Sequence, residues 1–439
     1  MSLLIVVAGL ILLLVLMLAF KLDAFLSFVI VSLAVGLGEG MTFEKVIGSI
    51  EKGIGSTLGY LVIIIGFGAM LGKLVAESGA AQRITTRIIN AFGLKRVQLA
   101  VMLTGFIIGV PLFYDVGFVI LIPLVFTVAV SARLPLLYVG LPMLASLSVT
   151  HGFLPPHPAP TAIALTFGAD IGKTMLYGIL IAIPAILLSG PVFYKLVKKV
   201  DATPMNEFVN LKQFTDEELP GLWVSIFSAL MPVILIGSST VLKIILSEQS
   251  LTGKIAGYLG NPVVAMIISL LAATYMLGIA RGRKIGDIMK SMTHSVSSLT
   301  MVLLVIAGAG GLKQILVDSG VSQYIGESLS NTGISPLILG WLIATILRIS
   351  VGSATVAGIT TAGIVLPLVH SSGVNPELMV IAIGSGSLMT AHVNDGGFWL
   401  VKQYFNLSIK DTLRTWTVME TCIGVTGLAG VLIINAIIS

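Results

Sequence analysis

Charged side chains are scarce in this sequence. Asp, Glu, Lys and Arg together make up 10% of its 439 residues, whereas a soluble domain typically carries about a quarter. Apolar residues make up 56%, the mean hydropathy is +1.05, and apolar runs of about 17–25 residues recur, as a helix needs to cross about 30 Å of hydrocarbon. Alternating segments of about ten residues, typical of membrane β-barrels, are absent. The sequence therefore predicts an all-α polytopic membrane protein.

The sequence also has only one cysteine and none of the enzyme motifs named below. The single cysteine, Cys422, excludes an intramolecular disulfide framework and a cysteine-based metal site. No phosphate-binding loop, H-E-x-x-H or G-x-S-x-G motif occurs. A membrane hydrolase with His151 and His157 as metal ligands is disfavoured, because the intervening prolines prevent helical ligand spacing. We therefore expect that the protein is not an enzyme and binds neither a metal nor a cofactor. The dispersed basic residues predict that it has no nucleic-acid partner.

The chain contains an internal repeat. Glu77-Ser-Gly recurs as Asp318-Ser-Gly, the Pro135-x-Leu step recurs at Pro376, and His151 recurs as His392, all at an offset of 241 residues. The first apolar run, residues 3–20, lacks the basic start and the small-residue cleavage site of a signal peptide, so we expect a retained helix. We expect about twelve spanning helices, divided into residues 1–56 (N-terminal helices), 57–195 (repeat 1), 196–221 (cytoplasmic loop), 222–295 (linking helices) and 296–439 (repeat 2).

The loop charges predict that the two repeats have opposite orientations. The connection that follows residues 58–76 carries four basic residues, Arg83, Arg87, Lys95 and Arg96. The equivalent connection after Asp318 has no Lys or Arg before Arg348. By the positive-inside rule the first connection is cytoplasmic and the second external, and continued alternation places both termini outside. Inverted-topology repeats are typical of secondary transporters, which use them for alternating access. An old duplication without a mechanism is the alternative.

Glycine and proline interrupt two apolar stretches at equivalent places. Residues 105–117 break the first, residues 348–358 break the second, and each break is followed by a proline, Pro123 or Pro367. Such residues free backbone N–H and C=O groups, which must lie in protein or face a watery cavity. The sequence therefore predicts two re-entrant helical hairpins whose tips meet near the membrane midplane. Helix N-termini at the tips would attract an anion.

A second pair of interruptions follows the hairpins, at residues 151–161 and 392–399, and each begins at a repeat-related histidine. Ionisable residues inside membrane segments are functional candidates. Asp115 and Asp395 could carry a proton, as could the histidines, whose ordinary pKa is near neutrality. Arg348 could pair with a substrate carboxylate. Structural alternatives stay open, because Asp115 and Arg348 could neutralise each other and the proline-rich segment could be a simple loop.

Several of these segments resemble the gluconate permease family, part of the ion transporter superfamily of inverted-repeat carriers. The resemblance covers essentially the whole chain, and its specific strings are residues 113–130, 151–164, 352–361, 391–409 and 412–421. It implies proton-coupled uptake of gluconate or a related sugar acid across a bacterial inner membrane. It also implies a scaffold domain, a transport domain and a homodimer.

One position departs from the resemblance. Members of the family often have glutamine just before Gly-Ser-Ala-Thr, where this sequence has Val351. The resemblance therefore leaves the substrate open among gluconate, idonate, glycerate, other hexonates and D-serine. The coupling ion is open as well, because hairpin oxygens also suit sodium. A passive channel is disfavoured, since no charge ring or carbonyl filter motif is present.

We predict a proton symporter with two sets of site residues. The substrate-binding set comprises Gly109, His151, Arg348, Gly352, Ser353, Thr355, Asn394 and Asp395. The proton-coupling set comprises Asp115, His151, His392 and Asp395.

Overall fold

A computed structural model describes residues 2–112, 114–204, 214–245, 250–297, 300–320, 334–393 and 395–438. Within these ranges all regular structure is helical and no strand occurs. Seven helical segments are long and apolar enough to span a membrane, or up to eight if a pair with a 105° bend counts as one span. The predicted all-α multi-pass class is confirmed. The number of full spans among the described residues is below the expected twelve, because breaks leave apolar helices of only 10–17 residues.

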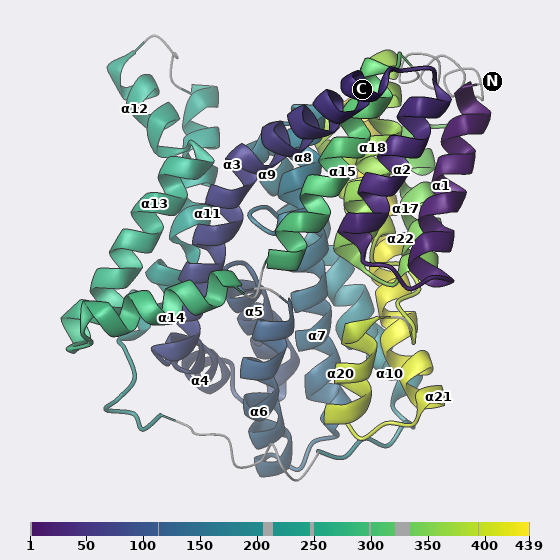
Figure 1. The fold of residues 1–439 in the computed structure, drawn as a ribbon. Helices are drawn as coiled ribbons and strands as arrows, with labels where there is room; N and C mark the ends of the chain where they lie inside the picture. The colour runs from purple at the N-terminus through teal and green to yellow at the C-terminus, as the bar shows by residue number, and fades with distance from the viewer. Residues whose placement is uncertain are drawn as a thin grey trace.

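The N-terminal part forms three helices, and two of them begin at side-chain caps. The Asp23 carboxylate accepts a hydrogen bond from Phe25 N at 2.8 Å at the start of α2, and Thr42 caps α3. The expected span at residues 58–76 is only the second half of α3, which begins much earlier. Its 35 residues make it about 52 Å long, so it crosses the bundle at a slant (Figure 1). The bounds are α1 (Ser2–Leu18), α2 (Ala24–Gly38) and α3 (Phe43–Glu77).

The first repeat is a series of short helices. Its basic connection, expected as a loop, is largely the helix α4, which bends by 105° into α5. Apolar residues at helical spacing, such as Ile84 and Ile88, are buried and explain why this segment is helical. The bounds are α4 (Ala80–Phe92), α5 (Val97–Gly109), α6 (Tyr114–Ser131), α7 (Leu136–Phe153), α8 (Pro158–Phe167), α9 (Ile171–Leu187) and α10 (Phe193–Val197), with a π-helical turn at Leu188–Val192.

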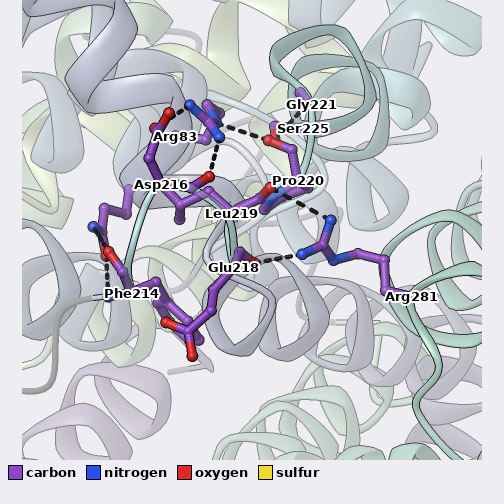
Figure 2. A network of polar contacts seen from close by, with 10 residues as sticks. Arg83, Phe214, Asp216, Glu218, Leu219, Pro220, Gly221, Ser225 and Arg281 are labelled. Carbon is purple, nitrogen blue, oxygen red and sulfur yellow. Dashed lines mark hydrogen bonds and ion pairs between the residues drawn. The ribbon is translucent and has the colours of Figure 1, made fainter.

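The linking helices lie apart from α1 and α2, on the left in Figure 1. Their bounds are α11 (Leu222–Ile245), α12 (Leu251–Leu259), α13 (Pro262–Ala273) and α14 (Ile285–Ser297). The segment before α11 is fixed to the bundle by arginines (Figure 2). Arg83 of α4 bonds to Asp216 and Pro220, and Arg281 donates to the carbonyls of Glu218 and Leu219.

The second repeat follows the order of the first. Its bounds are α15 (Thr300–Asp318), α17 (Pro336–Val351), α18 (Ala354–Ser372), α19 (Pro376–Gly386), α20 (Gly396–Tyr404), α21 (Ile409–Thr412) and α22 (Val418–Ile438), with a π-helical turn at Leu413–Thr417. The starting pairs are Val97 and Pro336, Tyr114 and Ala354, and Leu136 and Pro376. Each pair lies within two residues of the offset read from the sequence. The order of helices therefore repeats, while the opposite orientation of the repeats stays a prediction.

Helices α7 and α19 form the centre of the molecule, and nearly all of their residues are buried. They approach each other backbone to backbone, because a Cβ added at Gly384 would lie 2.2 Å from the Gly152 carbonyl oxygen. Small residues permit such close contacts between membrane helices. The two chain ends lie at the same end of the molecule (Figure 1), while the side of the membrane that they face stays a prediction.

Candidate functional site

The two predicted hairpin breaks are present. In the second repeat, α17 ends at Val351, Gly352 has φ +82°, and α18 begins at Ala354. Glycine is suited to this turn because residues with a side chain rarely adopt a left-handed backbone conformation. The Ser353 hydroxyl accepts a hydrogen bond from Val356 N at 3.3 Å and so caps α18. In the first repeat, α5 ends at Gly109 and α6 begins at Tyr114.

Arg348 lies in the last turn of α17, directly before the second break, and is 3% exposed. Its Nη2 lies 3.0 Å from Asp395 Oδ1, and its Nη1 donates to the Gly352 carbonyl oxygen. Its Nε is buried and has no hydrogen-bond partner among the described residues. A buried guanidinium with an unused donor can bind a further acceptor, such as a carboxylate.

Asp395 joins three elements at this point. Besides the pair with Arg348 of α17, its Oδ2 accepts hydrogen bonds from Phe398 N at 3.1 Å and from Trp416 Nε1 at 3.3 Å. The first bond caps α20, and the second reaches the π-helical turn before α22. The carboxylate is therefore fixed in position by one charged and two neutral partners.

The first break is packed tightly against the proline-rich segment. His157 Nε2 and the Gly109 carbonyl oxygen are 2.7 Å apart, and a Cβ added at Gly109 would lie 2.4 Å from Thr150 Oγ1. A cavity of about 10 Å³ lies beside this contact, lined by His157, Val110 and Pro111 among others. It has room for about one water molecule and is too small for a sugar acid.

A row of aromatic rings connects the two breaks. The ring centroids of Trp416 and Tyr114 are 5.6 Å apart, and those of Tyr114 and His151 are 6.3 Å apart. The His151 and His157 ring centroids are 5.3 Å apart, and His157 also contacts the end of α5. His151 also interacts electrostatically with Arg348. The polar residues of the two repeats thus meet in one region.

The structure brings together only some of the predicted site residues. Arg348, Gly352 and Asp395 are in direct contact, and His392 Nε2 lies 3.2 Å from the Ile349 carbonyl oxygen, one residue from Arg348. The remaining predicted members within the described residues are Ser353, which caps α18, half-buried Thr355 in its first turn, Gly109 at the other break, and His151 in the aromatic row.

Two predicted members lie outside the described part of the chain. They are Asn394 and the side chain of Asp115, whose backbone lies in α6. Within the described residues Arg348 forms its ion pair with Asp395. The tertiary fold, which places the start of α20 against the end of α17, decides this partner. The alternative in which Asp115 neutralises Arg348 stays a prediction, because the Asp115 side chain lies outside the described residues.

Glu420 of α22 also belongs to this region, although it was not among the site residues predicted from the sequence. It is 1% exposed, its carboxyl lies near the Ser148 hydroxyl, and it interacts electrostatically with both Arg348 and Asp395. A signal was present in the sequence, because Glu420 is the only acidic residue between Trp416 and the end of the chain. A lone carboxyl in an apolar run marks a functional candidate.

Comparison with known proteins gives consistent matches over the full length. The profile of GntP family permeases matches residues 1–437. The chain is 52% identical to a high-affinity gluconate transporter and 51% identical to an L-idonate transporter, both of Escherichia coli K12, with 100% of each chain covered. It is 46% identical to the gluconate permease of Bacillus subtilis 168, again over 100% of both chains.

Two solved structures share the fold. The YdaH transporter of Alcanivorax borkumensis gives a TM-score of 0.67 at 14% identity, covering 94% of this chain and 97% of that one. MtrF of Neisseria gonorrhoeae gives 0.65 at 16% identity, covering 93% and 94%. These likenesses show the architecture of a transporter fold and nothing finer.

Proposed function

The chain belongs to the GntP family of permeases, and from that premise we propose that it takes up gluconate or a related sugar acid by proton symport. Its two relatives at 51–52% identity are a gluconate and an L-idonate transporter. Both substrates are monoanions with several hydroxyl groups, so a hexonate is the substrate class that the relatives favour. Glycerate and D-serine remain alternative substrates for the uptake test.

The observation that supports this proposal most is Arg348. A permanent cation is buried at a helix break, and its Nε has no hydrogen-bond partner among the described residues. A sugar-acid carboxylate would satisfy that donor and bring the negative charge that a buried cation favours. The substrate hydroxyls would then form hydrogen bonds with backbone groups at the breaks beside Gly352 and Gly109 and with the Ser353 and Thr355 hydroxyls.

Proton coupling is the second part of the proposal. The region already holds the half-buried carboxylate of Asp395, so an incoming anion adds a second negative charge where little water is present, which is costly. A proton bound on the outside would offset that charge, and its loss inside would favour release. Asp115, Asp395, His151 and His392 remain the predicted carriers, although Asp395 is already paired with Arg348.

The membrane arrangement belongs to the same proposal. We place the protein in the bacterial inner membrane as a homodimer, with both termini outside and the two repeats inverted so that their exchange gives alternating access. Labelling of single cysteines introduced at residues 2 and 438, before and after permeabilisation, reports the side of each terminus. Labelling of both only after permeabilisation would overturn this orientation.

Uptake into proteoliposomes tests the function. Labelled gluconate should accumulate under an imposed inward proton gradient, and an uncoupler should abolish the accumulation. Unlabelled L-idonate, glycerate and D-serine compete in parallel assays and rank the substrates. Accumulation under a sodium gradient alone would support the carrier function and overturn the proton coupling. The absence of uptake under either gradient would overturn the gluconate assignment.

A further inference from the structure

Glu420 occupies an unusual position for a carboxyl group. It is the least exposed of the buried charged residues in the described part of the chain, at 1%. It lies in the long helical segment Ile409–Ile438, about a third of the way along an apolar span. Its Oε1 is buried without a hydrogen-bond partner among the described residues. A carboxyl held this way is costly to ionise, so its presence calls for a functional explanation.

The groups around Glu420 come from three directions. Trp416, one turn before Glu420 on the same helical segment, donates a hydrogen bond to Asp395 at the start of α20. Asp395 in turn pairs with Arg348 of α17 at 3.0 Å. Both charged groups therefore lie near the Glu420 carboxyl and interact with it electrostatically. Helix α7 contributes the Ser148 hydroxyl, which lies near the carboxyl. His151 follows one turn further along the same helix. Arg348 is therefore the one cation among the described residues that interacts with Glu420, and Asp395 already forms an ion pair with it.

The other two helices against α22, α9 and α19, have their charged residues elsewhere. Glu377, in the first turn of α19, accepts a hydrogen bond from Asp170 N at the start of α9. The contact between α19 and α22 lies at the opposite end of α19, where a Cβ added at Gly424 would meet the Ser385 carbonyl oxygen at 2.8 Å. The first turns of α9 and α19 are thus distant from Glu420.

Counting charges shows what a proton on Glu420 would accomplish. With Glu420 ionised and no substrate, Arg348, Asp395 and Glu420 together carry one net negative charge. With Glu420 protonated and a monoanion bound, the same region again carries one net negative charge. The anion with an ionised Glu420 would give two negative charges, and that state is strongly disfavoured in a buried region. Binding of a proton and binding of the anion therefore favour each other.

We propose that Glu420 carries the coupling proton, and that Arg348 connects its protonation to the binding of the substrate carboxylate. This inference rests on the proposed function and names the proton site within it. On the outside, the Glu420 carboxylate accepts one proton to become the neutral acid, and Arg348 is then free to attract the sugar-acid carboxylate. On the inside, the proton leaves to water, and the restored carboxylate disfavours the bound anion. One proton moves with each monoanion, so net transport is electroneutral.

The experiment compares Glu420→Gln with a matched control, Glu377→Gln, in proteoliposomes. Glu377 is also a buried glutamate, and glutamine can keep its role as an acceptor. Two assays are needed, namely accumulation driven by a pH gradient and exchange of labelled for unlabelled gluconate without a gradient. Glu420→Gln should lose accumulation, with its inside-to-outside ratio falling to about one, and should keep exchange within about threefold of wild type. Exchange by the variant should no longer depend on pH, and Glu377→Gln should match wild type in both assays.

Further outcomes keep the test decisive. Retained accumulation by folded Glu420→Gln would overturn the proposal, and so would loss of exchange together with accumulation, because that pattern marks a binding residue.

If Glu420→Gln does not fold, Glu420→Asp replaces it and should keep coupling with an altered pH dependence. Loss of accumulation in folded Glu420→Asp would count against the proposal. Wild-type accumulation driven by membrane potential without a pH gradient would refute the one-to-one stoichiometry. Failure of wild type to accumulate gluconate under any gradient would instead overturn the proposed function.

Discussion

Two buried arginines of this protein have opposite surroundings. Arg83, 7% exposed, uses all three of its nitrogens, because Nε donates to the Pro220 carbonyl at 2.8 Å and Nη1 and Nη2 donate to Asp216 at 2.6 and 2.8 Å (Figure 2). Arg348, 3% exposed, has partners for Nη1 and Nη2 and none for Nε within the described residues. Burial alone therefore does not determine whether all the donors of an arginine have partners.

The difference lies in what else each arginine could bind. Arg83 fixes the segment before α11 to α4, and most of its acceptors are backbone carbonyls that cannot leave. Arg348 lies at a helix break beside two carboxyl groups, half-buried Asp395 and buried Glu420. A cation with saturated donors stabilises a fold, whereas one with a free donor can exchange partners during transport. Substitutions at each arginine and each partner test this contrast.

Replacing Arg348 with alanine should have the largest effect on transport. The variant loses the proposed carboxylate ligand and leaves half-buried Asp395 without its counter-charge, so the ratio of maximal rate to KM should fall at least about hundredfold. Initial rates of gluconate uptake measure the change, with Arg83→Ala as the control for a lost buried arginine. Uptake by Arg348→Ala within a few-fold of wild type would remove the basis for the proposed binding site.

Asp395→Asn should have the next largest effect on transport. Asparagine can still accept the hydrogen bond from Phe398 N and so keep the cap of α20, but Arg348 loses its ion-pair partner. We expect uptake to fall at least about tenfold, because the net charge that balances proton and anion changes by one unit. Uptake measured over a range of external pH gives the result, and a wild-type rate and pH profile would contradict it.

Arg83→Ala should change stability and leave substrate affinity unaltered. The Pro220 and Asp216 carbonyls lose their donor, and the cost of such unpaired groups is about 1–3 kcal/mol. Thermal unfolding in detergent should show a lower transition temperature, while KM for gluconate stays within about twofold of wild type. A large rise in KM with unchanged stability would assign Arg83 to the transport site and erase the contrast with Arg348.

Asp216→Asn should have the smallest effect of the four. The Asp216 side chain is 73% exposed, and Arg83 keeps its bonds to two backbone carbonyls. The loss in stability should be below about 1 kcal/mol, as for other exposed ion pairs. Comparison of the thermal transitions of Asp216→Asn and Arg83→Ala checks this ranking, and equal losses would show that the carboxylate, and not the carbonyls, fixes this segment.

The amino-acid sequence by itself determined the class of the protein. Few charges and long apolar runs require a helical membrane protein, and the offset of 241 residues that relates His151 to His392 anticipated the repeated order of helices. The breaks at Gly109 and Gly352 could be located as well, because glycine and proline interrupt helices through local backbone effects. The specific strings around these breaks also identified the family correctly.

Only the tertiary structure decided which polar groups meet. The sequence names Arg348 and Asp395 as candidates, but their pairing depends on how the end of α17 packs against the start of α20, 47 residues later. Glu420 lies within the string 412–421, but the sequence did not single it out, and only the fold brings its carboxyl near the same arginine. Electrostatic interactions depend on distance in space and on exclusion of water, and neither follows from the order of residues along the chain.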